Sequence, residues 1–139
     1  MKLAPINESL LNGEDHSWLA SKHGTDTAHG KILDGTALGA IYPISGGGLA
    51  KSGTILALNT ATNKLVPFDN ATSANGLNVA YGILFTSVEI SDGLGNFLDT
   101  PCAVLKHGQV LTAKLPRTNV QTGGPHANAI SGLTNIIFR

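Results

Sequence analysis

Short apolar runs separated by turn residues dominate the larger, C-terminal part of the chain. They are rich in β-branched residues, and such runs bounded by Gly, Asn and Asp are typical of β-strands. Residues 59–63 form a hairpin-sized loop between the first two runs. The pattern therefore predicts an all-β domain with strands at 54–58, 64–68, 101–111 and 136–138.

The longest strand candidate spans residues 79–90. Ile83, Leu84 and Phe85 form a continuous apolar run, whereas polar and apolar residues alternate near its C-terminal end. We therefore expect this strand to run through the core and to emerge into solvent. The turn residues at 91–96 connect it to its partner strand.

Proline and polar residues refine the arrangement of the remaining elements. Pro67 cannot donate a backbone hydrogen bond, so it favours a sheet edge for the strand at 64–68. The polar stretch at 69–78 and the Gly-rich stretch at 118–125 are predicted to be loops.

The first fifty residues have a weaker pattern. Residues 1–13 show no sustained periodicity and predict an arm that does not pack on its own. Residues 15–22 predict two turns of helix, with an acidic N-cap and a glycine stop. Among the residues that follow, 31–33 and 38–44 are the best strand candidates.

The stretch SGGGLAKS at 45–52 resembles a phosphate-binding loop at first sight. That loop needs glycines where Ser45 and Ala50 stand here, and it needs a helix N-terminus directly after it. A strand-like run follows instead. We interpret the stretch as a turn that leads into a strand.

Composition argues against several classes of partner. Nine Lys and Arg balance nine Asp and Glu, and the basic residues are scattered, so we expect no nucleic-acid binding. No apolar run approaches the roughly 20 residues of a membrane helix, and no signal peptide is recognisable. Charged residues are only 13% of the chain, about half the usual ~25%, which suits an oligomer or a protein bound to something large.

Candidate chemistry is sparse. His16, His23 and His29 are near one another in sequence, so a metal site is conceivable, but the chain has no paired cysteines and no H-E-x-x-H motif. The nucleophile motif G-x-S-x-G is also missing. We therefore predict a protein that is not an enzyme and needs no cofactor or metal. Cys102 lies in an apolar run, where it acts as a small buried hydrophobic residue.

The order of several segments resembles one family, the head decoration proteins of lambda-like tailed bacteriophages. The segments are SGTILAL at 52–58, NKLVPFD at 63–69, VAYGILF at 79–85 and KHGQV at 106–110. The flanks DHSWLASKHGT at 15–25 and TNIIFR at 134–139 are similar to an actinophage-type subgroup of these proteins.

The resemblance implies a fold, an assembly and a location. The fold would be a small β-barrel-like domain, the β-tulip, at residues 24–139, preceded by a capsid-binding arm at residues 1–23. The assembly would be a homotrimer bound to the major capsid protein at three-fold or quasi-three-fold positions. The protein would be made in the host cytoplasm and would stabilise the expanded head from its outer surface.

An unpaired arm suits strand addition to a partner sheet. Trp18 and Leu19 are apolar anchors beside this arm, although core packing at the sheet edge explains them equally well. The candidate capsid-binding residues are Pro5, Ile6, Leu10, Leu11, Trp18 and Leu19.

The alternative function is a β-sandwich module on the virion that binds a receptor or a glycan. Such a module would need an exposed platform of aromatic side chains.

Overall fold

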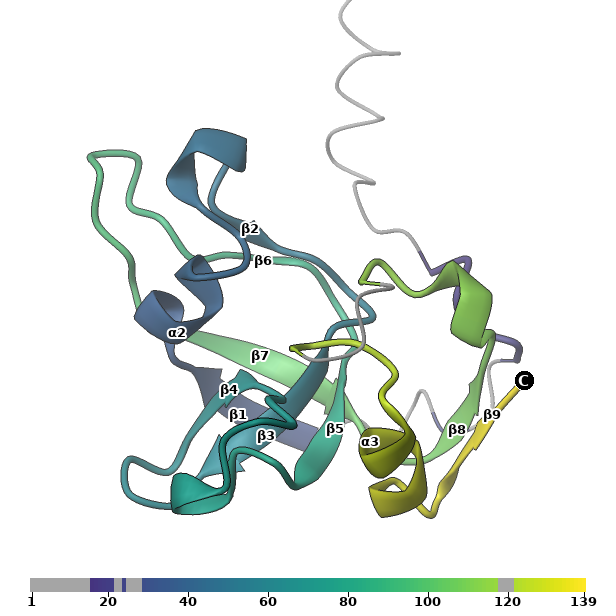
Figure 1. Ribbon diagram of the computed structural model, residues 1–139. Helices are drawn as coiled ribbons and strands as arrows, with labels where there is room; N and C mark the ends of the chain where they lie inside the picture. The colour runs from purple at the N-terminus through teal and green to yellow at the C-terminus, as the bar shows by residue number, and fades with distance from the viewer. Residues whose placement is uncertain (1–15, 22–23, 25–28, 118–121) are drawn as a thin grey trace, which may run out of the picture.

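A computed structural model describes residues 16–21, 24, 29–117 and 122–139 of the chain. Figure 1 shows short strands arranged around a central barrel, with short helices at its periphery. The strands are β1 (His29–Leu33), β2 (Leu49–Ala50), β3 (Ile55–Asn59), β4 (Lys64–Pro67), β5 (Ala80–Leu84), β6 (Val88–Glu89), β7 (Thr100–Leu105), β8 (Gly108–Val110) and β9 (Ile136–Phe138).

The helices of the described residues are short, and they comprise two α-helices and three 3₁₀ turns. They are α2 (Gly35–Gly39), η2 (Ile44–Gly46), η3 (Ala74–Gly76), η4 (Thr112–Lys114) and α3 (Ala127–Gly132).

Five strands pair in the order β1-β4-β3-β5-β7, and β7 pairs back with β1 to close the barrel. Neighbouring strands are antiparallel except β1 and β4, which are parallel and meet at the single pair Leu33 and Leu65. Two further sheets have two strands each, antiparallel β2–β6 and parallel β8–β9. The structure confirms the predicted all-β class.

Alternate residues of the barrel strands enter two different cores. Each barrel strand contributes to the interior cluster, with Leu33, Leu65, Leu56 and Leu84 from β1, β4, β3 and β5, and with Cys102 and Val104 from β7. In β3, β4, β5 and β7, direct neighbours of these residues along the chain enter a second cluster outside the barrel. Because successive side chains of a strand point to opposite faces, these four strands are buried on both faces. These neighbours are Ile55, Ala57, Val66, Ile83 and Leu105.

The second cluster lies between the barrel wall and the C-terminal elements. Ala129 and Leu133, at α3, and Ile136 of β9 cover the barrel from this side, together with Trp18 and Val110. Burial on both faces explains why the strands appear in the sequence as continuous apolar runs.

Several predicted elements are confirmed. The runs at 64–68 and 136–138 contain β4 and β9, the run at 54–58 coincides with β3 except for its last residue, Asn59, and the weak candidate at 31–33 lies within β1. SGGGLAKS, predicted as a turn that leads into a strand, begins in the turn of η2, with Gly47 at a φ of 106° that glycine adopts readily. It also contains the two residues of β2 and then leads into β3. Of the predicted loop at 118–125, residues 118–121 lie outside the described residues.

The predicted strand at 79–90 is two strands, β5 and β6. Between them Phe85 donates its N–H to the carbonyl of Ala103, at 2.9 Å. The chain then leaves the barrel wall and pairs with β2 instead. The predicted partner, 101–111, likewise divides into β7, which pairs with β5, and β8, which pairs with β9.

The strand predicted at 38–44 is wrong, because helix α2 occupies its first part. The Asp34 carboxylate caps this helix by accepting the N–H of Ala37 at 3.1 Å, which satisfies one of the free donors of the first turn.

The helix predicted at 15–22 is also wrong over the described residues 16–21. A turn at Ser17 and Trp18 precedes a β-bridge between Leu19 and Val110. Backbone pairing with β8 replaces the helical hydrogen bonds of so short a segment.

The edge position predicted for β4 is wrong, since β4 lies between β1 and β3. Phe68 donates its N–H to Ile55, so the Pro67 nitrogen faces the side of β1. On that side β1 pairs with β4 only at Leu65. The sheet therefore requires no N–H donor at Pro67, two residues further along β4.

Candidate interaction surface

The residues predicted to bind a partner fall into two groups. Pro5, Ile6, Leu10 and Leu11 lie outside the described residues. Only Trp18 and Leu19 can be placed.

Trp18 is a core residue. Its side chain is 1% exposed and belongs to the outer cluster. The indole Nε1–H donates a hydrogen bond to the Ser52 hydroxyl oxygen at 3.1 Å. Core packing, the alternative that the sequence left open, therefore describes the position of this ring.

Leu19 forms an isolated antiparallel β-bridge with Val110 of β8. The Leu111 N–H donates to the Trp18 carbonyl at 2.5 Å, and the Ala20 N–H donates to the Gln109 carbonyl at 3.0 Å. The Leu19 side chain is half-buried against the outer cluster. The N-terminal end of the described chain is thus held to the domain by main-chain pairing.

His16 adds a second attachment. Its ring stacks on Phe85 with centroids 4.9 Å apart and an interplanar angle of 10°, and its Nε2 lies 2.8 Å from the Phe85 carbonyl oxygen. Of the other two clustered histidines, His29 is in β1 and His23 lies outside the described residues. No group of three metal-ligating side chains occurs in the described part of the chain.

Two adjoining hollows beside Trp18 form a surface that the sequence analysis missed. They have volumes of about 290 Å³ and 310 Å³ and share Leu49, Lys51 and Pro116. Lys114 lines the first hollow and Arg117 the second. We call this surface the basic groove. The remaining lining residues are Trp18, Ser52 and Ser87 in the first hollow, and Ile41, Tyr42, Pro43 and Gly46 in the second.

Arg117 is held in a defined position at the groove. Its Nε donates to the Thr122 carbonyl at 2.7 Å, and its guanidinium carbon lies 6.0 Å from the centre of the Tyr42 ring. The Tyr42 hydroxyl contacts the Thr54 hydroxyl at 2.5 Å. Burial raises the pKa of the Tyr42 phenol, so the ring stays neutral beneath the cation.

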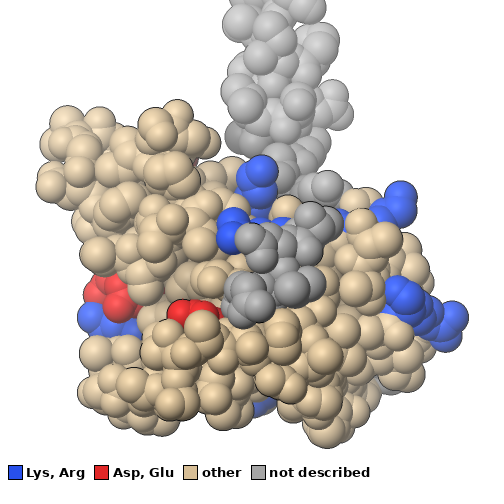
Figure 2. All heavy atoms as spheres, in the orientation of Figure 1, with Lys and Arg blue, Asp and Glu red and all other residues tan. Residues whose placement is uncertain are grey.

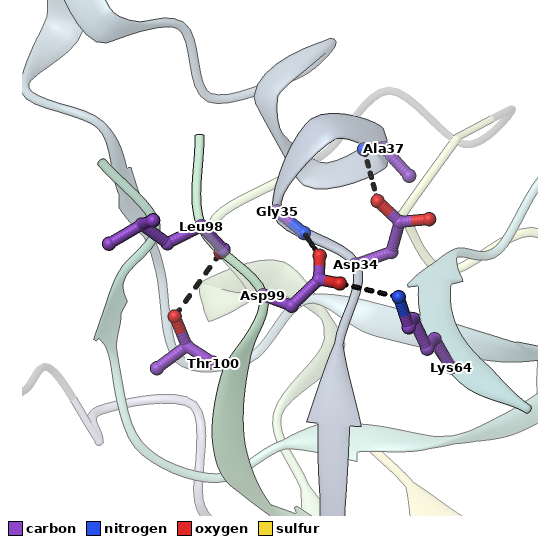
Figure 3. Close-up of polar contacts among 7 residues, drawn as sticks. All are labelled: Asp34, Gly35, Ala37, Lys64, Leu98, Asp99 and Thr100. Carbon is purple, nitrogen blue, oxygen red and sulfur yellow. Dashed lines mark hydrogen bonds and ion pairs between the residues drawn. The ribbon is translucent and has the colours of Figure 1, made fainter. Parts of the chain in front are cut away.

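Lys64, by contrast, is neutralised on another part of the surface. It forms an ion pair with Asp99, and the second oxygen of Asp99 accepts the N–H of Gly35 at 3.1 Å (Figure 3). The Lys64 hydrogen bond lowers the pKa of Asp99, and the same bond raises the pKa of Lys64. This charge pair joins the start of α2 to β4 and is not free for a partner.

The turn at residues 91–96 presents an apolar side chain to solvent. The Asp92 carboxylate accepts hydrogen bonds from the N–H groups of Leu94 and Asn96, at 2.7 and 3.1 Å, and from the Asn96 side chain at 3.0 Å. These bonds lower the pKa of Asp92. They hold a compact turn on which the Leu94 side chain is 84% exposed.

The aromatic residues do not form an exposed platform. All seven belong to the described part of the chain, and each is buried or half-buried. Tyr81 is also covered by the Lys106 ammonium, 3.8 Å from the ring centre. A module that binds glycans on flat aromatic rings is therefore not favoured.

Charged groups are unevenly spread over the visible surface. In Figure 2, most Lys and Arg groups lie in the upper centre and on the right, whereas the Asp and Glu groups lie on the left and left of centre, with a basic group beside them at the left edge. Within the described residues, no helix is long and apolar enough to cross a membrane.

Comparison with known proteins gives one match. The family model described as Bacteriophage lambda head decoration protein D matches residues 13–136. No curated protein and no solved structure matches the chain.

Proposed function

Because the chain belongs to the bacteriophage lambda head decoration protein D family, we propose that it coats the expanded capsid as a homotrimer at three-fold or quasi-three-fold positions. The family is one of structural capsid proteins rather than enzymes, and its place is the virion capsid. The match over residues 13–136 carries the proposal. The membership of an actinophage-type subgroup and the β-tulip form of the barrel are parts of the same proposal.

The surface composition supports an assembly of several copies. Charged residues make up 13% of the chain, and interfaces between subunits are depleted of charge. Large apolar side chains are also exposed on the single chain, where they are available for contacts between copies. They are Ile32, Val79, Leu94, Leu98 and Ile137.

We propose that residues 1–23 form a capsid-binding arm and residues 24–139 the decoration domain. Backbone pairing of residues 18–20 with β8 supports this proposal, because it fixes the C-terminal part of the arm to the domain. The apolar residues upstream of it would then make the contacts with the major capsid protein. They are Pro5, Ile6, Leu10 and Leu11.

Two measurements test the assembly and the arm. Light scattering of the pure protein should give about three times the 14.3 kDa chain mass, and a monomer at micromolar concentration contradicts the trimer.

A chain truncated before His16 should stay folded, because Trp18 is retained, yet should no longer bind heads that lack the protein. Equal binding by the truncated and full-length proteins contradicts the role of the arm.

A further inference from the structure

We propose that the basic groove binds an acidic segment of the major capsid protein, as a second attachment site beside the N-terminal arm. This inference rests on the proposed function. It adds which surface of the domain contacts the capsid and which kind of capsid segment that surface binds.

The groove is positively charged without internal compensation. Lys51, Lys114 and Arg117 line it, and no carboxylate does so among the described residues. None of the three has an ion-pair partner within the described part of the chain, unlike Lys64. Glu89 pairs with Leu49 across β2 and β6 but lines neither hollow. A segment that carries carboxylates is therefore the complementary partner.

The shape favours an extended protein segment over a small anion. The two hollows adjoin along Leu49, Lys51 and Pro116, so the surface is elongated. Leu49 and Pro116 offer apolar surface between the cations, which suits a chain that alternates acidic and apolar residues. Carboxylates would receive charge-assisted hydrogen bonds from the ammonium and guanidinium groups, which are stronger than bonds between neutral groups.

The groove lies where the proposed arm joins the domain. Trp18 lines the first hollow and follows His16 by only two residues. An arm bound to the capsid would hold the groove close to the same capsid surface. The two sites then act together, because the second contact forms at a high effective concentration once the first has formed.

Charge reversal in the full-length chain tests the proposal. The double variant Lys51→Glu with Lys114→Glu changes two exposed residues of the groove. The matched control, Lys31→Glu with Arg139→Glu, makes the same change in net charge outside it. We expect the groove variant to bind undecorated heads at least about tenfold more weakly than the control at low salt. The difference should shrink near 1 M salt, where the Debye length is about 3 Å.

Binding of the wild-type protein to undecorated heads distinguishes failure of the proposed function from failure of the groove proposal. If the wild-type protein does not bind heads, the proposed function fails. If it binds and both double variants bind equally well or are weakened equally, the groove proposal is overturned while the proposed function stands.

Carbodiimide cross-linking identifies the occupant, because it joins lysine amines to carboxylates in direct contact. On decorated heads we expect Lys51 and Lys114 to be linked to Asp or Glu of the major capsid protein. Links from these lysines only to Glu8, Glu14 or Asp15 of the same protein would show that its own N-terminal segment fills the groove, and would overturn the proposal.

Discussion

The indole nitrogen of Trp18 donates a hydrogen bond to the Ser52 hydroxyl, 3.1 Å away, and so joins the N-terminal segment to the residues that lead into β3. The same ring is buried in the cluster that packs on the outside of the barrel. The proposed arm at residues 1–23 is therefore joined to the fold at Trp18, and its contacts with the capsid are left to the residues upstream of this ring.

Replacing Trp18 tests this assignment. Trp18→Ala removes a fully buried ring and should lower the free energy of unfolding by about 3–5 kcal/mol, measured by chemical denaturation. Trp18→Phe keeps most of the apolar contact and should cost less. A loss below about 1 kcal/mol for Trp18→Ala would mean that the ring does not contribute to the core.

Two glycines with different surroundings provide a matched pair. A Cβ on Gly35 would lie 2.1 Å from the Leu98 carbonyl oxygen, whereas nothing lies within 4 Å of a Cβ on Gly30. Gly35→Ala should therefore destabilise the protein by roughly 1–3 kcal/mol. Gly30→Ala should be neutral or slightly stabilising. Equal melting temperatures for the two variants would contradict the close approach of α2 to residue 98.

Asp99 should make stability depend on pH. Its pKa is lowered in the folded protein by the Lys64 hydrogen bond, so its contribution is present above the ordinary carboxyl pKa near ~3.9 and is lost as pH falls through the lowered value. The raised pKa of Lys64 gives a contribution that is lost as pH rises through its folded value. The melting temperature of wild type minus that of Asp99→Asn should be largest near neutral pH and shrink in acid and in strong alkali. A difference independent of pH would show that this ion pair contributes nothing.

Cys102 should be unreactive in the folded protein. The thiol is buried, and burial raises its pKa to about 11. Because the thiolate is the reactive form, a chromogenic thiol reagent at pH 8 should modify the native protein slowly and the denatured protein rapidly. Modification at the same rate in both states would place Cys102 at the surface.

The sequence predicts the barrel strands well because burial on both faces leaves continuous apolar runs. Leu56 and Ile83 belong to such runs, and both are fully buried in different clusters. The run at 79–90 suggests one long strand, because polar and apolar residues alternate after Phe85 in a pattern that is equally typical of a strand. That second part is β6, which pairs with β2 outside the barrel. The helix α2 is missed because its start depends on the Asp34 cap, and its five residues carry too little periodicity to reveal it.

The candidate interaction surface is less visible in the sequence. Lys51 and Lys114 are 63 positions apart, and only the folding of residues 112–117 against the end of β2 brings them to one groove. Trp18 appears in the sequence as an apolar residue beside an arm, and this pattern is the same for a binding anchor and for a core residue. Its contact with Ser52 depends on tertiary structure that no local pattern contains.

Electron cryomicroscopy of purified virions with and without this protein tests the central claim most directly. We expect virions that carry the protein to show additional density on the outer capsid surface, at three-fold and quasi-three-fold positions, into which three copies of the barrel fit. Virions without it should lack this density. Identical capsid surfaces in the two samples would contradict a role in head decoration.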